Sequence, residues 1–149
     1  MEKIISGGQT GVDRAALDFA IENGIPHGGW CPKGRRAEDG PLPLRYKLEE
    51  TASAEYDART RKNVEDSDGT LVIFRGELKG GTAYTAEYCQ AIRKSHFLVD
   101  LDVLIDRKAV ETWLVKNKIA VLNVAGPRES QSPGIYNLAK ALLEDFQFV

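Results

Sequence analysis

The sequence has few cysteines, no long hydrophobic run and no excess of either charge. Its two cysteines, Cys31 and Cys89, are too few for a disulfide framework and lack the spacing of a zinc site, so we expect free thiols in a reducing compartment. The longest apolar runs, such as residues 119–124, are too short to span a bilayer, and residues 1–8 lack the pattern of a signal peptide. These absences predict a cytoplasmic protein that does not enter a membrane.

The charge balance and the length are typical of one globular domain. Twenty Lys and Arg stand against 22 Asp and Glu, and the formal net charge of -2 argues against a nucleic-acid binder, which would carry a basic excess. A small anionic ligand stays compatible with this balance because it needs only a local positive site. With 149 residues, of which 42% are hydrophobic, we expect a single domain spanning residues 1–149.

Apolar runs alternate with amphipathic stretches, a pattern typical of a parallel sheet with crossover helices. The expected strands are residues 3–6, 27–30, 69–74, 97–101 and 119–124. Three expected helices are residues 12–23, 83–94 and 106–117. A last helix is expected to have Ser132 as its N-cap and Pro133 as its first residue. Its apolar stripe consists of Ile135, Leu138, Ala139, Leu142 and Phe146. The sequence therefore predicts a three-layer α/β domain with a mainly parallel five-stranded sheet.

Residues 33–68 break this rhythm, because they hold 17 charged residues, eight basic and nine acidic. Mixed charge at this density indicates a surface segment, and its expected helix, about 54–66, has few apolar anchors. We expect an insertion that folds as a lid over the end of the sheet. The alternative is a solvated excursion without a role.

One face of the helix in this insertion carries polar groups beside apolar ones. Tyr56, Thr60 and Asn63 fall at spacings of four and three, so they share a face. Buried amide and hydroxyl groups need hydrogen-bond partners. Those partners are either ligand atoms, with Arg59 beside them, or backbone groups of the turn at 66–69.

The first expected strand is followed by a glycine-rich loop, at the edge where open parallel sheets bind ligands. Gly7, Gly8 and Gly11 lack side chains, so their amides could approach an anion at the N-terminus of the next helix. Thr10 is placed to cap that helix, with Asp13 completing a capping box. The alternative is a tight turn that needs glycine only for its geometry, since the loop is neither a dinucleotide-binding motif nor a P-loop.

A second glycine pair stands before another expected helix. Gly80 and Gly81 precede Thr82, which is a suitable N-cap on its own account. Glu87 lies five residues into the helix, near enough to bind a ligand hydroxyl or to accept a proton. The alternative for Glu87 is a solvent-facing helical side chain.

The strand at 119–124 leads into a third loop, which contains Gly126 and Arg128. The planar guanidinium of Arg128 suits a phosphate or another oxyanion, although it could instead pair with Glu129 or lie in solvent. Three donor-rich loops at one sheet edge favour an anion or nucleotide pocket.

Cys31 ends another strand and could bind a soft metal or be redox-active, but it could equally be a small buried hydrophobe. We expect no tightly bound structural metal.

Several blocks of the sequence resemble the putative molybdenum carrier family and cover the chain nearly end to end. The blocks are SGGQTGVDRAALD at 6–18, GWCPKGR at 29–35, AEDG at 37–40, residues 56–68, SDGT at 67–70 and NVAGPR at 123–128. The resemblance implies a Rossmann-like fold, similar to that of the lysine-decarboxylase-like, cytokinin-activating phosphoribohydrolases. It also implies a binding or carrier protein for a phosphorylated heterocycle, either a nucleotide or molybdenum cofactor, a pterin that bears a phosphate and an oxo-metal centre.

The loops and the resemblance together indicate one set of candidate ligand-binding residues. We also expect a homo-oligomer, since related folds commonly pair. The candidates are Gly7, Gly8, Gln9, Thr10, Gly11, Arg14, Lys33, Arg59, Asn63, Gly80, Gly81, Thr82, Glu87, Gly126 and Arg128.

Two alternative functions use the same pocket. The phosphoribohydrolases have a P-G-G-x-G-T-x-x-E motif whose Glu assists cleavage of an N-glycosidic bond, and residues 80–87 keep the paired glycines, Thr82 and Glu87. Lys79 replaces the proline and the third glycine is missing, which weakens the match to the hydrolase motif. A hydrolase with Glu87 as its catalytic residue is the first alternative to a carrier. A regulatory nucleotide sensor is the second alternative.

Overall fold

Five short strands form an all-parallel central sheet in the computed structural model, which describes residues 1–148. In spatial order they are β2 (His27–Gly28), β1 (Lys3–Ile5), β9 (Val121–Ala125), β7 (Gly69–Phe74) and β8 (His96–Asp100). The register pairs Ile4 with Leu122 and Leu71 with Val124. The predicted α/β class and five-stranded parallel sheet are confirmed.

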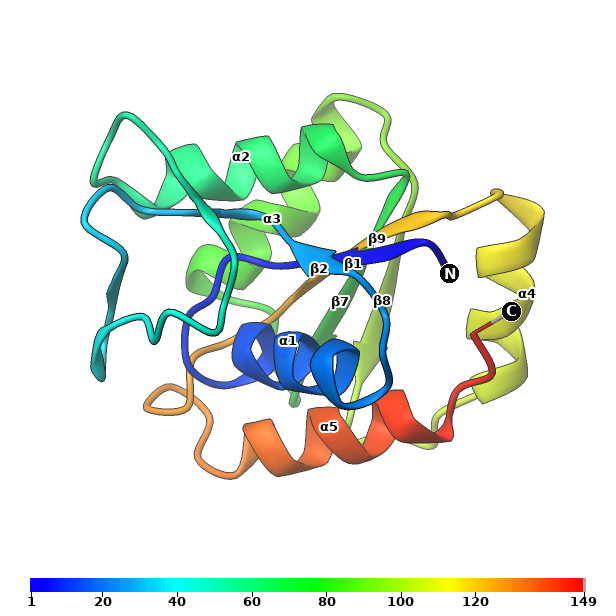
Figure 1. Ribbon diagram of the computed structural model, residues 1–149. Helices are drawn as coiled ribbons and strands as arrows, with labels where there is room; N and C mark the ends of the chain where they lie inside the picture. The colour runs from blue at the N-terminus through cyan, green and yellow to red at the C-terminus, as the bar shows by residue number, and fades with distance from the viewer. Residues whose placement is uncertain (149) are drawn as a thin grey trace.

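Helices cover both faces of this sheet, which makes three layers (Figure 1). α1 (Val12–Glu22) and α5 (Ile135–Asp145) pack together on one face, while α2 (Tyr56–Asp66) and α3 (Gly80–Ala91) pack together on the other. α4 (Arg107–Lys116) lies toward the end at which the strands begin. Every residue of β7 is buried, as expected for a strand covered on both sides.

The strand order creates a crevice at the carboxyl edge of the sheet. The last strand of the chain, β9, lies between β1 and β7. The chain therefore leaves β1 toward β2 on one side and leaves β7 toward β8 on the other. Loops diverge at such a reversal, and open α/β sheets bind their ligands there.

The segment between β2 and α2 lies beyond the carboxyl ends of the strands (Figure 1, cyan). It holds two small sheets, in which β3 (Trp30–Cys31) pairs with β6 (Glu49–Glu50) and β4 (Arg36–Ala37) pairs with β5 (Gly40–Pro41). Leu42 and Tyr46 from this segment form a small core with Leu17 and Cys31.

Much of the charge in this segment is paired with the rest of the domain. Asp39 accepts two hydrogen bonds from the guanidinium of Arg14, at 3.0 and 3.1 Å. Asp18 of α1 accepts hydrogen bonds from Arg45 at 2.9 Å and from the Tyr46 hydroxyl at 2.6 Å. The charged segment is thus fastened to α1 at several points.

Two helices begin at other residues than the sequence predicted. α5 begins at Ile135 rather than Pro133, because Gly134 adopts a left-handed conformation (φ 89°) and the Glu129 carboxylate accepts the amides of Gly134 and Tyr136. α3 begins at Gly80, so its two glycines form the first helical turn instead of a preceding loop.

The predicted capping box at α1 is also wrong, because Gly11 is the N-cap and no side chain caps the helix. The Asp13 carboxylate instead accepts the backbone amide of Gln9, at 3.3 Å. The hydroxyl of Thr10 donates to Glu38 and accepts the amide of Glu129, so it joins the insertion to the loop after β9.

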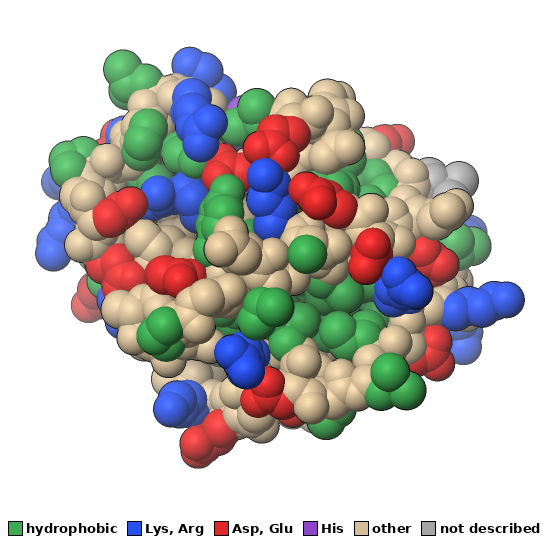
Figure 2. Space-filling view, turned by 90° about the horizontal axis from the view of Figure 1, so that it is seen from below, with side chains coloured by type: hydrophobic (Ala, Val, Ile, Leu, Met, Phe, Trp, Pro, Cys, Tyr) green, Lys and Arg blue, Asp and Glu red, His purple; other side chains and the backbone are tan. Residues whose placement is uncertain are grey.

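Figure 2 views the molecule from below, the side on which α5 lies in Figure 1, and shows acidic and basic side chains interspersed with hydrophobic ones. Leu138 of α5 is 43% exposed, so it does not belong to the buried stripe that the sequence predicted, whereas Ile135, Ala139, Leu142 and Phe146 are buried. None of the helices in residues 1–148 is both long and apolar enough to cross a membrane.

Candidate functional site

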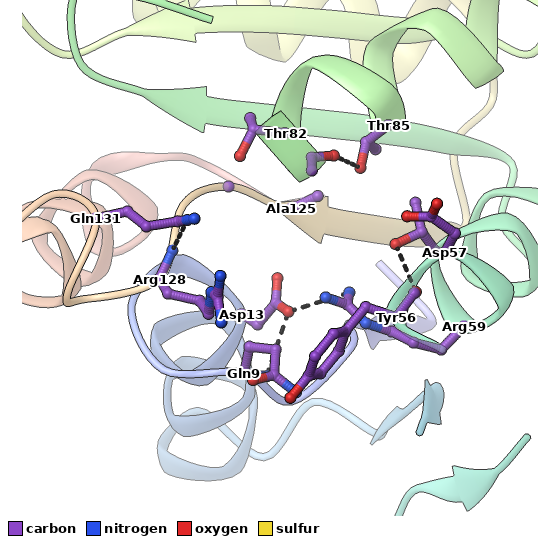
Figure 3. Close-up of a pocket in the computed structure, with 13 residues that line it drawn as sticks. Gln9, Asp13, Tyr56, Asp57, Arg59, Thr82, Thr85, Ala125, Arg128 and Gln131 are labelled. Atoms are coloured by element: carbon purple, nitrogen blue, oxygen red, sulfur yellow. Dashed lines mark hydrogen bonds and ion pairs between the residues drawn. The ribbon is translucent and has the colours of Figure 1, made fainter. Parts of the chain in front are cut away.

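A cleft of about 220 Å³ lies at the crevice between β1 and β7 (Figure 3). Its lining comes from the loops after β1 and β9 and from the N-terminal parts of α1, α2 and α3. The lining residues are Gln9, Asp13, Tyr56, Asp57, Arg59, Thr60, Gly81, Thr82, Thr85, Ala125, Gly126, Arg128 and Gln131. Thr82 and Gln131 also line a neighbouring hollow of about 340 Å³, which extends past Phe74 and Lys79. The two hollows together approach the size of a small-molecule site.

Asp13 and Arg59 form a buried ion pair on one side of the cleft. Arg59 Nη1 lies 3.4 Å from Asp13 Oδ2, and the two side chains are 15% and 3% exposed. Burial raises the pKa of the Asp13 carboxyl, and this effect outweighs the lowering by Arg59, the Gln9 amide and Arg14. Because each charge is the counterion of the other, this side of the cleft has little net charge to offer a ligand.

Further positive charge in the cleft lining comes from Arg128, whose charge also acts on Glu38 of the insertion, and from the first turn of α3. Among the described residues, the Arg128 guanidinium has no ion-pair partner, and its backbone amide is held by Gln131 Oε1 at 3.2 Å. α3 points its N-terminus at the same space, and no side chain caps it. The first amides of a helix lack partners within it and carry a partial positive charge. These groups are donors for an anion.

Tyr56 lies between the two arginines. Its ring centroid is 5.9 Å from Cζ of Arg59 and 5.8 Å from Cζ of Arg128. The side chain is about one-third exposed, and within the described residues its hydroxyl makes no hydrogen bond. The ring therefore stands at the mouth of the cleft, held by its contacts with the two guanidinium groups.

Most of the glycines in the predicted cradle make room for protein atoms. The space beside Gly7 is filled by the Arg59 guanidinium, and that beside Gly8 by the side chains of Leu42 and Leu48. A Cβ on Gly11 would meet the Pro127 carbonyl at 2.3 Å. These glycines let the insertion, α2 and the loop after β9 approach the first loop closely.

Gly81 is different, because a Cβ there would meet no atom within 4 Å. Its neighbour Gly80 is equally open but has a positive φ of 58°. Gly81 lines the cleft, so the open space beside it is the space in which a ligand would lie. By contrast, Gly126 is packed against the Ile73 carbonyl and the Val12 side chain, and a Cβ there would not fit.

The structure brings together six of the predicted candidates in the cleft lining: Gln9, Arg59, Gly81, Thr82, Gly126 and Arg128. Three others contact the cleft from behind, because Gly7 supports Arg59, Gly11 packs on the loop of Arg128 and Gly80 opens α3 and lines the neighbouring hollow.

The remaining candidates make other contacts. Asn63 donates to the Trp30 carbonyl at 3.0 Å and accepts the Trp30 amide at 2.8 Å, so its amide is satisfied by backbone, although not by the 66–69 turn. Arg14 is bound to Asp39 and to the Gly8 carbonyl. Lys33 and Glu87 are exposed and lie outside the cleft lining. Cys31 is fully buried, and burial raises the pKa of its thiol.

Seven lining residues were not among the predicted candidates: Asp13, Tyr56, Asp57, Thr60, Thr85, Ala125 and Gln131. Sequence reasoning used Asp13 only as a capping residue and Tyr56 only as a member of a helical face. For Gln131, proximity to Arg128 along the chain was an available signal. Asp13 pairs with Arg59, 46 residues away, so no local pattern marks it. Tyr56 contacts Arg59 on its own helix, but its second partner, Arg128, comes from the loop after β9.

The fold and cleft define a class of α/β domain with a ligand cleft at the switch point of a parallel sheet. The circularly permutated YpsA SLOG family matches residues 4–147, so the chain belongs to this family. The crystal structure named "Putative molybdenum carrier protein", from Syntrophus aciditrophicus SB, is 50% identical and has a TM-score of 0.96. The match covers 99% of this chain and 96% of that one, and it confirms the resemblance seen in the sequence. None of the curated proteins matches the chain.

Proposed function

We propose that the cleft binds a phosphorylated heterocycle, either a nucleotide or a pterin such as molybdenum cofactor, and that the protein carries this ligand without changing it. One observation supports this most directly: the guanidinium of Arg128, which has no ion-pair partner within residues 1–148, and the uncapped N-terminus of α3 line the same cleft. A helix N-terminus and a nearby arginine are a common combination for binding phosphate.

The phosphate would lie between Arg128 and the first turn of α3. The amides of Gly81 and Thr82 are available there, and the Thr82 hydroxyl makes no hydrogen bond within residues 1–148. The heterocycle would extend toward Asp13 and Arg59, whose charges are already matched to each other. This division puts the charged part of the ligand on the charged side of the cleft and the neutral ring on the other.

Molybdenum cofactor as cargo draws support from the name of the 50% identical structure. The donors in the cleft are guanidinium, amide and hydroxyl groups, which suit phosphate oxygens. Within residues 1–148 no three His, Cys, Asp or Glu side chains are grouped so that they could hold a metal ion. We therefore propose that such a cargo is held through its phosphate and its ring.

Native mass spectrometry of freshly purified protein, combined with molybdenum analysis, tests the proposal. We expect a bound species with the mass of a phosphorylated pterin or nucleotide, and molybdenum in stoichiometric amount identifies the cofactor. The Arg128→Ala variant should lose the bound species. The matched control is Arg107→Ala, because Arg107 is exposed on α4 at the other end of the domain. Wild-type protein that carries no phosphorylated compound and binds none when it is added would overturn the proposal.

A further inference from the structure

Two buried polar atoms of cleft-lining residues have no hydrogen-bond partner within residues 1–148. Among the described residues, three buried side-chain atoms are in this condition: Gln9 Oε1, Arg59 Nε and Arg35 Nε. The first two belong to residues that line the cleft. Folded proteins leave few such atoms unpaired, because an unmade hydrogen bond on a buried group is costly. Two of them at one cavity indicate groups that a ligand satisfies.

The two atoms are held in place and belong to neighbouring side chains. The Gln9 amide and Arg59 Nη1 donate to the same oxygen, Asp13 Oδ2, at 3.3 and 3.4 Å, and the two residues flank Asp13 in Figure 3. Gln9 Nε2 donates to the Arg36 carbonyl at 2.8 Å, and this hydrogen bond fixes the orientation of the side-chain amide. The Oε1 atom is then the acceptor that has no partner within residues 1–148. Gln9 is only 1% exposed, and the Arg59 guanidinium is confined over Gly7. Neither side chain is free to find a partner elsewhere.

The pair consists of one acceptor and one donor, and this polarity selects the kind of heterocycle. We propose that the cleft reads the lactam edge of a ring, with Gln9 Oε1 accepting from the ring N–H and Arg59 Nε donating to the adjacent carbonyl. Guanine, hypoxanthine and the 4-oxo pterins all present this edge. Adenine presents a ring acceptor beside an amino donor, so its polarity is reversed. This inference rests on the proposed function and narrows its ligand to a phosphorylated 6-oxopurine or 4-oxopteridine.

Tyr56 lies beside the position that such a ring would occupy. Its ring lies over the guanidinium groups of Arg59 and Arg128, and within the described residues no hydrogen bond holds its hydroxyl. Of the proposed phosphate donors, Thr82 on α3 lies across the cleft from Gln9 and Arg59 in Figure 3, whereas Arg128 is drawn on the same side as Asp13. A ligand bound in this way would lie along the cleft with Tyr56 free to stack on the exposed face of its ring.

Calorimetric titration of ligand-free protein with GMP, IMP, AMP and neopterin monophosphate tests the inference, because all four carry a phosphate and only AMP lacks the lactam edge. We expect the three lactam compounds to bind at least about tenfold more tightly than AMP, since the reversed edge forfeits two hydrogen bonds. Gln9→Leu should reduce this preference to about threefold, because one of the two hydrogen bonds to the lactam edge remains. Arg59→Lys, which keeps the charge beside Asp13 but removes Nε, should have the same effect.

Gln90→Leu is the matched control, because Gln90 is exposed on α3 outside the cleft, and it should keep the wild-type preference. Thermal melting confirms that each variant is folded. If only one of Gln9→Leu and Arg59→Lys is folded, that variant alone is enough to test the inference. Equal binding of all four compounds would overturn the lactam inference and leave the proposed function intact. Binding of none of them would overturn both.

Discussion

Gly7 is the position at which one added methyl group tests how the cleft is built. A Cβ on Gly7 falls 2.0 Å from Nη1 and 2.6 Å from Cζ of Arg59, so Gly7→Ala forces the guanidinium to move. Arg59 then leaves Asp13, its partner at 3.4 Å, and the almost fully buried Asp13 side chain keeps the Gln9 amide as its remaining hydrogen-bond donor. A buried group that loses its partner costs about 1–3 kcal/mol, and we expect a loss near 2 kcal/mol.

Urea and thermal unfolding measure this loss. A destabilisation of about 2 kcal/mol should lower the melting temperature by roughly 4–8 °C in a domain of this size. The matched control is Gly81→Ala, whose Cβ meets no atom within 4 Å and lies in the first turn of α3. It should leave stability unchanged or raise it by up to about 1 kcal/mol, because alanine favours the helix, yet it should weaken ligand binding.

The two alanine variants separate stability from binding. If Gly7→Ala unfolds at the same temperature as the wild type, Arg59 is not confined as the structure indicates and the reasoning is refuted. If Gly81→Ala binds the phosphorylated ligand as tightly as the wild type, the N-terminus of α3 is not the phosphate site.

Three further substitutions test the electrostatics and the catalytic alternative. The raised pKa of Asp13 means that the folded state holds this proton more tightly than the unfolded chain. The unfolding free energy of the wild type, measured relative to that of Asp13→Asn, should therefore fall as the pH rises from about 4 toward the folded pKa. A difference between the two proteins that stays constant over this pH range would contradict the reasoning. Partial burial raises the pKa of Glu38, but hydrogen bonds from Ser130 and Thr10 together with the charge of Arg128 outweigh it and leave the pKa below its ordinary value. The stability advantage of the wild type over Glu38→Gln, no more than about 1 kcal/mol, should thus be complete above pH 4.5 and disappear as the pH falls through the lowered folded pKa in the same measurement. Glu87→Gln should retain ligand as the wild type does in native mass spectrometry, because Glu87 is exposed outside the cleft; loss of a nucleotide-cleaving activity in this variant would instead identify an enzyme.

The elements that a local pattern defines were predicted well. Four of the five strands of the sheet follow apolar runs, whereas β2 consists of His27 and Gly28. β7 was bounded correctly at both ends because its burial on two faces produces an uninterrupted apolar sequence. The start of α5 was missed because the residue that caps it, Glu129, lies in the preceding loop and reaches forward to Gly134 and Tyr136. A proline after a serine looks like a helix start, but that pattern cannot reveal a carboxylate that approaches from outside it.

The site shows the same division between local and distant causes. The glycines were rightly located at the carboxyl edge, but their sequence could not tell whether the vacant space faces a ligand or another segment of the chain. Gly7 and Arg59 are 52 residues apart in the sequence, and only the folded structure shows that the guanidinium fills the space beside the glycine. Gly81 has no such neighbour, so its missing side chain leaves room in the cleft itself.

The charged insertion shows why its composition alone was ambiguous. Its charge density indicated surface, yet Glu38 accepts hydrogen bonds from Thr10 in the loop after β1 and from the amide and hydroxyl of Ser130 in the loop after β9. Asp39 binds Arg14, so consecutive acidic residues of the insertion fasten it to three parts of the domain. These contacts hold together the two loops that supply Gln9 and Arg128 to the cleft. A change in the insertion that breaks them therefore reaches both the ring side and the phosphate side of the site, even though none of Glu38, Asp39 and Ser130 lines it.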